Sequence, residues 1–207
     1  TDLPEAEKTE KMTYRIDGLR EAVSEAVAET DESLMEKFFE GEAFTQKELI
    51  DGIHKGMTNG IITPVVCVSS TDFSGIDMLL KEINLLVPSA DEAPAPEAVC
   101  GDDAVTVECS ADKPFSAQVF KTVVDPFAGK MSYIKVMSGV LKADSSVLNT
   151  STGETEKIGK LYTMFGKQQT EISQAEAGDI AVAVKINAST SDSLADPSRA
   201  VVFDRID

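Results

Sequence analysis

Turn-forming residues recur at regular intervals through the second half of this 207-residue chain, and they limit how long any strand between them can be. They are found at Asp125-Pro126 with Gly129, Ser138-Gly139, Thr152-Gly153, Gly166 and Gly178-Asp179, roughly 10 to 14 residues apart. Short apolar runs separated in this way are typical of an antiparallel β-barrel. We therefore expect residues 104–207 to form a barrel that folds in isolation.

One strand of this barrel is marked by strict alternation of side chains. Ile180, Val182, Val184 and Ile186 alternate with Ala181, Ala183 and Lys185. Because successive side chains of a strand point to opposite faces, we expect the four larger apolar residues to face the core. Among the turns, Gly129 and Gly139 are expected to adopt positive φ rather than to hold phosphate.

The first part of the chain has a helical pattern. Leu19, Val23, Val27, Leu34 and Phe38 recur at near-helical spacing among glutamates, which predicts one amphipathic helix over Asp17–Glu40 that ends at Gly41. Two further helices are signalled by their first residues. Thr45-x-x-Glu48 and Ser74-x-x-Asp77 both fit the capping box, in which a hydroxyl and a carboxylate bond the free amides of the first turn.

Between these two helices lies the apolar run Ile61–Val68, which predicts a buried strand that begins near Pro64. The order helix, helix, strand, helix is typical of the end of an α/β domain. A single strand would leave both rows of its backbone groups unpaired. We therefore expect the chain to be a piece of a longer protein.

The composition changes between the two parts. Ala93-Pro94-Ala95-Pro96 and its acidic neighbours can neither form a helix nor bury apolar area, which predicts a linker. The expected organisation is an α/β piece over 1–88, a linker over 89–103 and the barrel over 104–207. The fold class is thus α+β and multidomain.

The net charge of −17 is concentrated in the first half. Residues 1–112 hold 25 acidic against 8 basic side chains, whereas residues 113–207 hold 11 of each. The second half can therefore contact RNA through a local basic patch, although phosphates repel the chain as a whole.

The remaining composition excludes several classes of protein. Three cysteines without a Cys-x-x-Cys pair and a single histidine argue against a disulfide framework and against a metal centre. No apolar run approaches the roughly 20 residues that span a bilayer, and the first residues do not fit a signal peptide. We expect a cytoplasmic protein without a membrane partner.

Several short blocks follow one another in the second half, namely Phe120-Lys-Thr122, Asp125-Pro126, Gly129-Lys130, Ser138-Gly139, Ile158-Gly159 and Ala177–Ala181. Together they resemble the second domain of a translational GTPase, bacterial elongation factor G above all. The resemblance implies a translation-factor β-barrel. It also implies a parent protein that uses GTP to move tRNA and mRNA through the ribosome.

The first half resembles the end of the GTPase domain of the same family. The stretches that carry this likeness are Glu21–Glu29, Leu34–Lys37, Glu40–Glu42, Glu48-Leu49 and Thr63-Pro64-Val65. In the family, the strand is followed by a Ser-Ala motif at the guanine base, and here Ser69, Ser70 and Thr71 stand in its place. The resemblance implies that these three residues are a remnant of a nucleotide-binding loop.

The residues that bind phosphate in such enzymes are missing from this chain. A P-loop requires Gly-x-x-x-x-Gly-Lys-Ser/Thr, and none of the pairs Gly129-Lys130, Gly159-Lys160 and Gly166-Lys167 fits it. Asp72-Phe-Ser-Gly75 matches the magnesium-associated Asp-x-x-Gly pattern, which we attribute to chance. We expect no catalytic residue and no cofactor in this chain, so GTP and Mg²⁺ belong to the parent protein.

The resemblance also implies the partners of the parent protein. They are the rest of the GTPase domain and the ribosome, whose small-subunit RNA the second domain contacts. The lysines available for RNA are Lys113, Lys121, Lys130, Lys135, Lys142, Lys157, Lys160, Lys167 and Lys185. Two alternatives are a ribosomal protection or release-type GTPase, and a free-standing, non-catalytic barrel that binds a protein.

Overall fold

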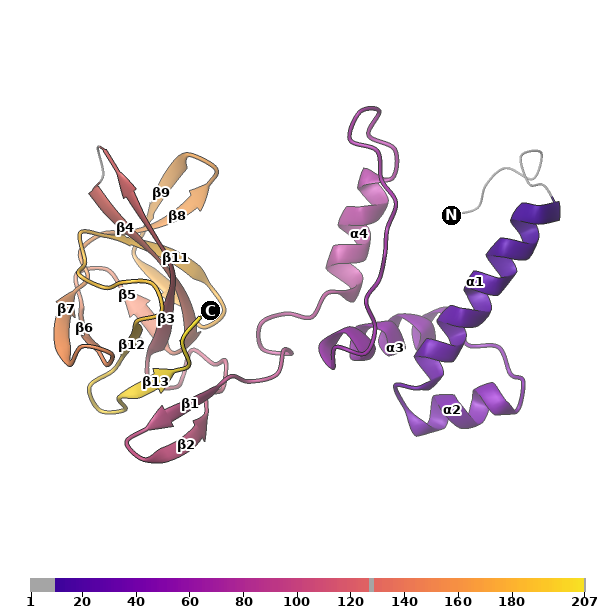
Figure 1. Ribbon diagram of the computed structural model, residues 1–207, viewed down its shortest axis with the longest axis horizontal. Helices are drawn as coiled ribbons and strands as arrows, with labels where there is room; N and C mark the ends of the chain where they lie inside the picture. Colours follow the sequence, from indigo (N-terminus) through magenta and orange to yellow (C-terminus); the bar gives the residue numbers. More distant parts are fainter. Residues whose placement is uncertain (1–9, 127–128, 207) are drawn as a thin grey trace. The chain divides into compact units, whose positions relative to one another are not determined.

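The computed structural model describes residues 10–126 and 129–206, and the chain divides between Glu92 and Ala93 into two units. The first unit is helical and the second is built of β-strands (Figure 1). No helix of the described residues is long and apolar enough to cross a membrane.

The first unit contains four helices. They are α1 (Glu10–Ala28), α2 (Glu32–Phe39), α3 (Gln46–Thr58) and α4 (Ile76–Leu86). Helix α1 packs on α2 and α3, and α3 packs on α4. Val27 is fully buried where α1 meets α3, and a Cβ on Gly52 of α3 would lie 2.5 Å from Val27 Cγ1. The small size of glycine therefore permits the close approach of these two helices.

The single helix expected over Asp17–Glu40 was wrong, because the chain breaks between α1 and α2. Thr30 Oγ1 donates to the carbonyl of Val27 at 2.7 Å, which closes the last turn of α1. Asp31 then adopts an extended conformation and caps α2 by accepting from the Ser33 amide at 3.0 Å. Short polar side chains that bond the nearby backbone end helices in this way.

Of the two expected capping boxes, only the first is present. Thr45 and Glu48 exchange both hydrogen bonds at the start of α3. Helix α4 is instead preceded by Gly75, whose φ is 78° and which provides no side-chain cap, so the prediction for Ser74 was wrong. The left-handed turn at Gly75 directs the chain into α4 without help from a hydroxyl group.

The strand expected over Ile61–Val68 is also missing. This segment has no regular secondary structure, and the described part of the first unit contains no strand. A stretch with the composition of a strand therefore lacks the neighbour that would make it part of a sheet.

The second unit contains thirteen strands in its described residues. They are β1 (Glu97–Cys100), β2 (Asp103–Thr106), β3 (Ser116–Asp125), β4 (Gly129–Ser138), β5 (Val140–Lys142), β6 (Ser146–Asn149), β7 (Glu154–Lys157), β8 (Leu161–Phe165), β9 (Gln168–Ile172), β10 (Gln174–Glu176), β11 (Ile180–Val184), β12 (Ser193–Ala195) and β13 (Val201–Phe203). They form sheets in the orders β7-β6-β12-β3-β4-β11-β8-β9, β13-β1-β2 and β10-β5, with antiparallel pairing between neighbours. The expected antiparallel, barrel-like domain is confirmed.

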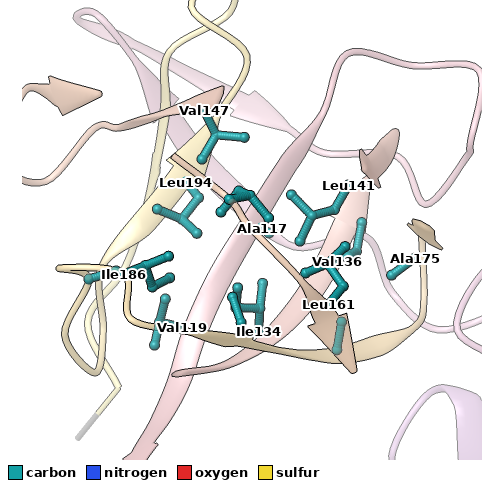
Figure 2. Close-up of a cluster of buried hydrophobic side chains, with 14 of the residues drawn as sticks. Ala117, Val119, Ile134, Val136, Leu141, Val147, Leu161, Ala175, Ile186 and Leu194 are labelled. Atoms are coloured by element: carbon teal, nitrogen blue, oxygen red, sulfur yellow. The ribbon is translucent and has the colours of Figure 1, made fainter. Parts of the chain in front are cut away.

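The core of this unit draws side chains from both the large sheet and the two-stranded one. Figure 2 shows Ala117, Ile134, Leu161 and Leu194 of the large sheet gathered with Leu141 of β5. These side chains are buried, and none is more than 1% exposed. The two sheets therefore enclose one continuous apolar cluster, and the close packing of its side chains stabilises the unit.

Strand β11 faces the core with its small residues, which reverses the expectation for Ile180–Ile186. Ala181 and Ala183 belong to the core cluster, whereas Ile180 is 54% exposed. Ile186 still reaches the core because Lys185 adopts a φ of 61°, which interrupts the alternation by one residue. A local pattern of large and small side chains does not show which face a core will cover.

Part of the range expected as a linker belongs to the second unit. Strand β1 pairs with both β2 and β13, and Ala98 of β1 packs in a second cluster with Val201 and Phe203. The Ala-Pro run ends at Pro96, and the alternating residues that follow it form a hairpin through Gly101, whose φ is 65°.

Both glycines singled out in the sequence have positive φ, 79° at Gly129 and 69° at Gly139. Gly139 also lies so close to the chain that a Cβ would be 2.6 Å from the backbone nitrogen of Phe115. The structure therefore requires glycine at position 139 for two independent reasons.

Candidate functional site

The three residues of the possible guanine loop begin a tight turn before α4. The Ser69 amide donates to the carbonyl of Ser74 at 2.9 Å, which closes the turn. Ser69 is half-buried, whereas Ser70 and Thr71 are exposed. The structure thus places the three residues together at the surface of the first unit.

Asp72 is bound within this same turn. Hydrogen bonds from the Ser69 hydroxyl, and then from the amide and hydroxyl of Ser74, lower the pKa of the Asp72 carboxyl. The amide of Ser74 lies 3.2 Å from Asp72 Oδ1. This carboxylate thus accepts hydrogen bonds from its own loop. No group of three or more potential metal ligands occurs in the described parts of the chain.

The nine lysines proposed for RNA contact are spread over several strands and turns. Lys113 is paired with Glu108 at 2.9 Å, and Lys160 with Glu171 at 2.7 Å. The hydrogen bond to Glu171 raises the pKa of Lys160. Lys130 is half-buried, and Lys135, Lys142, Lys157, Lys167 and Lys185 are exposed. The structure does not bring all nine together, so any RNA contact uses a subset of them.

Two of the lysines lie on a face of the large sheet that also carries aromatic side chains. Lys121, Tyr133, Val182 and Tyr162 stand directly opposite one another across β3, β4, β11 and β8. In the neighbouring row, Lys135 of β4 is opposite Ile180 of β11. Figure 1 shows β4 and β11 beside each other in this sheet.

This face points away from the core. Ile134 and Leu161, the chain neighbours of the two tyrosines, belong to the core cluster, so alternation places the tyrosines outside. Val182 lies outside that cluster, yet it is only 1% exposed between its two tyrosine neighbours. The two tyrosines that stand on either side of Val182 are themselves partly buried.

Further contacts hold the first tyrosine in place. The ring of Phe120 packs edge-on against that of Tyr133, with 6.2 Å between centroids. Lys121 Nζ lies 5.7 Å from the centre of the Tyr133 ring, within the range of a cation–π contact. We call Phe120, Lys121, Tyr133, Lys135, Tyr162 and Ile180 the tyrosine face.

The sequence analysis did not single out the aromatic members of the tyrosine face as site residues. The signal was present, because Tyr133 and Tyr162 each lie next to a large aliphatic residue in an alternating strand. The sequence could not show that a third strand, β11, would lie between them.

A family model described as elongation factor G domain 2 matches residues 114–196. A crystal structure of a protein from Thermus thermophilus is similar over 100% of this chain, with 30% sequence identity and a TM-score of 0.72. The chain spans 29% of the length of that protein. The match to the family model begins before β3 and ends just after β12, so it contains the core cluster of the barrel. Residues 114–196 therefore form a second domain of the elongation factor G type.

Proposed function

We propose that this chain is part of a translational GTPase of the elongation factor G class, which acts on the cytoplasmic ribosome. The observation that carries the proposal is the match of residues 114–196 to elongation factor G domain 2. The likeness to a longer Thermus thermophilus protein over the whole chain is consistent with it. In this proposal the barrel is a non-catalytic domain that contacts small-subunit ribosomal RNA.

The first unit is proposed to be the end of the GTPase domain. Its apolar segment 62–69 pairs with no strand among the described residues, as expected of a strand that would complete a larger sheet. Large apolar side chains are exposed in this unit, Val65 at 88% and Phe73 at 75% among them. Exposed apolar side chains of this kind are expected where further protein covers them.

GTP and Mg²⁺ are proposed to bind to residues outside this chain, with Ser69, Ser70 and Thr71 at the edge of the guanine pocket. The chain alone should then not bind a fluorescent guanine nucleotide at micromolar protein, because the phosphate contacts that supply much of such affinity are missing from its sequence. Submicromolar, magnesium-dependent binding in a fluorescence titration would contradict this assignment.

A chimera tests the proposed function directly. Residues 114–196 would replace the second domain of a bacterial elongation factor G, and GTP hydrolysis would be measured with and without ribosomes. We expect ribosome-stimulated hydrolysis to be retained. A chimera carrying Gly139→Ala, which places a Cβ against the backbone of Phe115, is the control for a disrupted barrel.

The same chimera distinguishes translocation from the alternatives. Movement of mRNA by one codon, followed by toeprinting, would support a translocase. Ribosome-stimulated hydrolysis without such movement would favour a ribosomal protection or release-type GTPase. A folded chimera whose GTP hydrolysis is not stimulated by ribosomes would refute the proposal and favour a free-standing binding module.

A further inference from the structure

We propose that the tyrosine face of the barrel binds single-stranded RNA. Unpaired bases stack on Tyr133 and Tyr162, and Lys121 and Lys135 contact the phosphates. The inference rests on the proposed function, in which the barrel contacts RNA. It specifies which part of the barrel makes this contact and which kind of RNA fits there.

The register of the strands provides two separate stacking positions. Tyr133 of β4 and Tyr162 of β8 are both opposite Val182 of β11, one on each side. Adjacent strands are about 4.8 Å apart, which places the two tyrosine backbones about 10 Å apart on one surface. Both side chains are partly exposed. A base that stacks on Tyr133 takes the place of Lys121 Nζ over the ring, which leaves that lysine free to contact a phosphate.

The charges of this face favour a polyanion, although the whole chain carries a net charge of −17. Lys121 is exposed at the β3 end of the row that holds both tyrosines, and Lys135 is exposed in the neighbouring row. Glu171, which is opposite Tyr162, is paired with Lys160 at 2.7 Å. Asp179, next to Ile180 in the chain, accepts the amide of Glu176 at 2.9 Å, which is a neutral donor.

The combination of rings and lysines indicates unpaired nucleotides in particular. Aromatic platforms within a basic groove bind single strands, because every base has a face that can stack. In a duplex the bases are already stacked on one another and paired, so they are not available to stack on aromatic side chains. A protein partner fits less well, because it would have to desolvate both exposed lysines.

The tyrosines themselves supply the measurement. The chain has no tryptophan and three tyrosines, and two of the three lie on the tyrosine face. A Tyr14→Phe variant of the full chain removes the third, so its tyrosine fluorescence reports on the face alone. We expect a short unstructured RNA to quench this fluorescence on binding, and a duplex of the same length to quench it far less.

Two substitutions separate stacking from charge. Tyr162→Leu keeps an apolar side chain over Val182 and should lose about half of the quenching. Lys121→Gln with Lys135→Gln should weaken binding about tenfold or more, and should reduce the slope of log affinity against log salt by about 1.4. The matched control, Lys142→Gln with Lys157→Gln, removes two exposed lysines from β5 and β7 and should leave both quantities nearly unchanged.

Several outcomes would overturn the inference. They are an absence of quenching in a folded Tyr14→Phe protein, equal affinity for duplex and single strand, or an equal loss in the control pair. Binding of a protein but not of RNA at this face would also contradict it. If short RNA is not bound while the chimera retains ribosome-stimulated hydrolysis, the inference fails and the proposed function stands. The reverse result would refute only the proposed function.

Discussion

The barrel and the helical unit differ in how completely each covers its own apolar side chains. In the barrel, fifteen buried residues form one cluster enclosed by its sheets. In the described part of the helical unit, the buried hydrophobic residues are Val27, Ala28 and Leu86, while Leu19, Phe39 and Leu80 are more than half exposed. The barrel thus has a complete core of its own, whereas the helices present apolar faces that this unit does not cover.

The largest expected consequence concerns the two units as separate fragments. Residues 93–207 should unfold in a cooperative thermal transition, because their core is internal. Residues 1–92 should show a broad change without a clear midpoint. Circular dichroism of both fragments tests this. A sharp transition in the helical fragment would show that the helical unit, like the barrel, has a complete core of its own.

The contribution of β1 to the barrel can be measured by changing the residue at which the barrel fragment begins. A fragment that begins at residue 104 lacks β1, the partner of β13, and loses the burial of Ala98. We expect it to fold, but with a midpoint more than about 5 °C below that of residues 93–207. Equal midpoints would show that β1 adds nothing to the stability of the barrel.

Truncating one leucine in each unit should have unequal effects. Leu161→Ala opens a cavity in the barrel core, where Leu161 is fully buried, and should destabilise the protein by about 2–5 kcal/mol. Leu80→Ala on α4 removes a side chain that is 56% exposed and should cost less than about 0.5 kcal/mol. Urea denaturation measures both, and a cost for Leu80 close to that for Leu161 would show that the helical face is covered.

A smaller contrast lies within the helical unit itself. Thr45→Ala removes the hydroxyl that caps α3 and should cost about 1 kcal/mol. Ser74→Ala should change the free energy of unfolding by less than about 0.5 kcal/mol, because Gly75 rather than Ser74 precedes α4. Equal effects in urea denaturation would indicate that both hydroxyls act as caps in solution.

The smallest expected effect is a pH dependence that comes from two carboxylates of the helical unit. The hydrogen bond from Lys55 lowers the pKa of Asp31 to about 2, and that from Lys37 does the same for Glu48. Because both values lie below the ordinary ones of 3.8 and 4.5, their stabilisation is present above about pH 4.5 and is lost as the pH falls towards 2. Carboxyl titration by NMR checks both values. Ordinary titration of either group would show that its ion pair does not form, and Glu48→Gln should flatten the acid response of helicity.

The sequence was most reliable where neighbouring residues decide the structure. The turn at Gly139 and the capping box of Thr45 and Glu48 rest on contacts between residues close in the chain, and both were predicted. The break at Thr30 and Asp31 is local as well, but the helical spacing that continues on both sides of it obscured the stop signal.

The candidate sites were predicted less completely than the fold. Ser69, Ser70 and Thr71 were identified through a family resemblance, and their part in nucleotide binding stays a prediction. The tyrosine face could not be anticipated, because Tyr133 and Tyr162 are separated in the chain and become near neighbours only when β11 pairs with both β4 and β8.

The sequence by itself determined the antiparallel barrel, its glycine turns and the acidic, helical character of the first unit. The tertiary structure alone decided which face of β11 meets the core, since that choice depends on β4 and β8, strands distant in the chain. It also decided that segment 62–69, which has the composition of a strand, pairs with none among the described residues. Side-chain patterns are local, whereas the hydrogen bonds of a sheet require a partner that the pattern of a single segment does not contain.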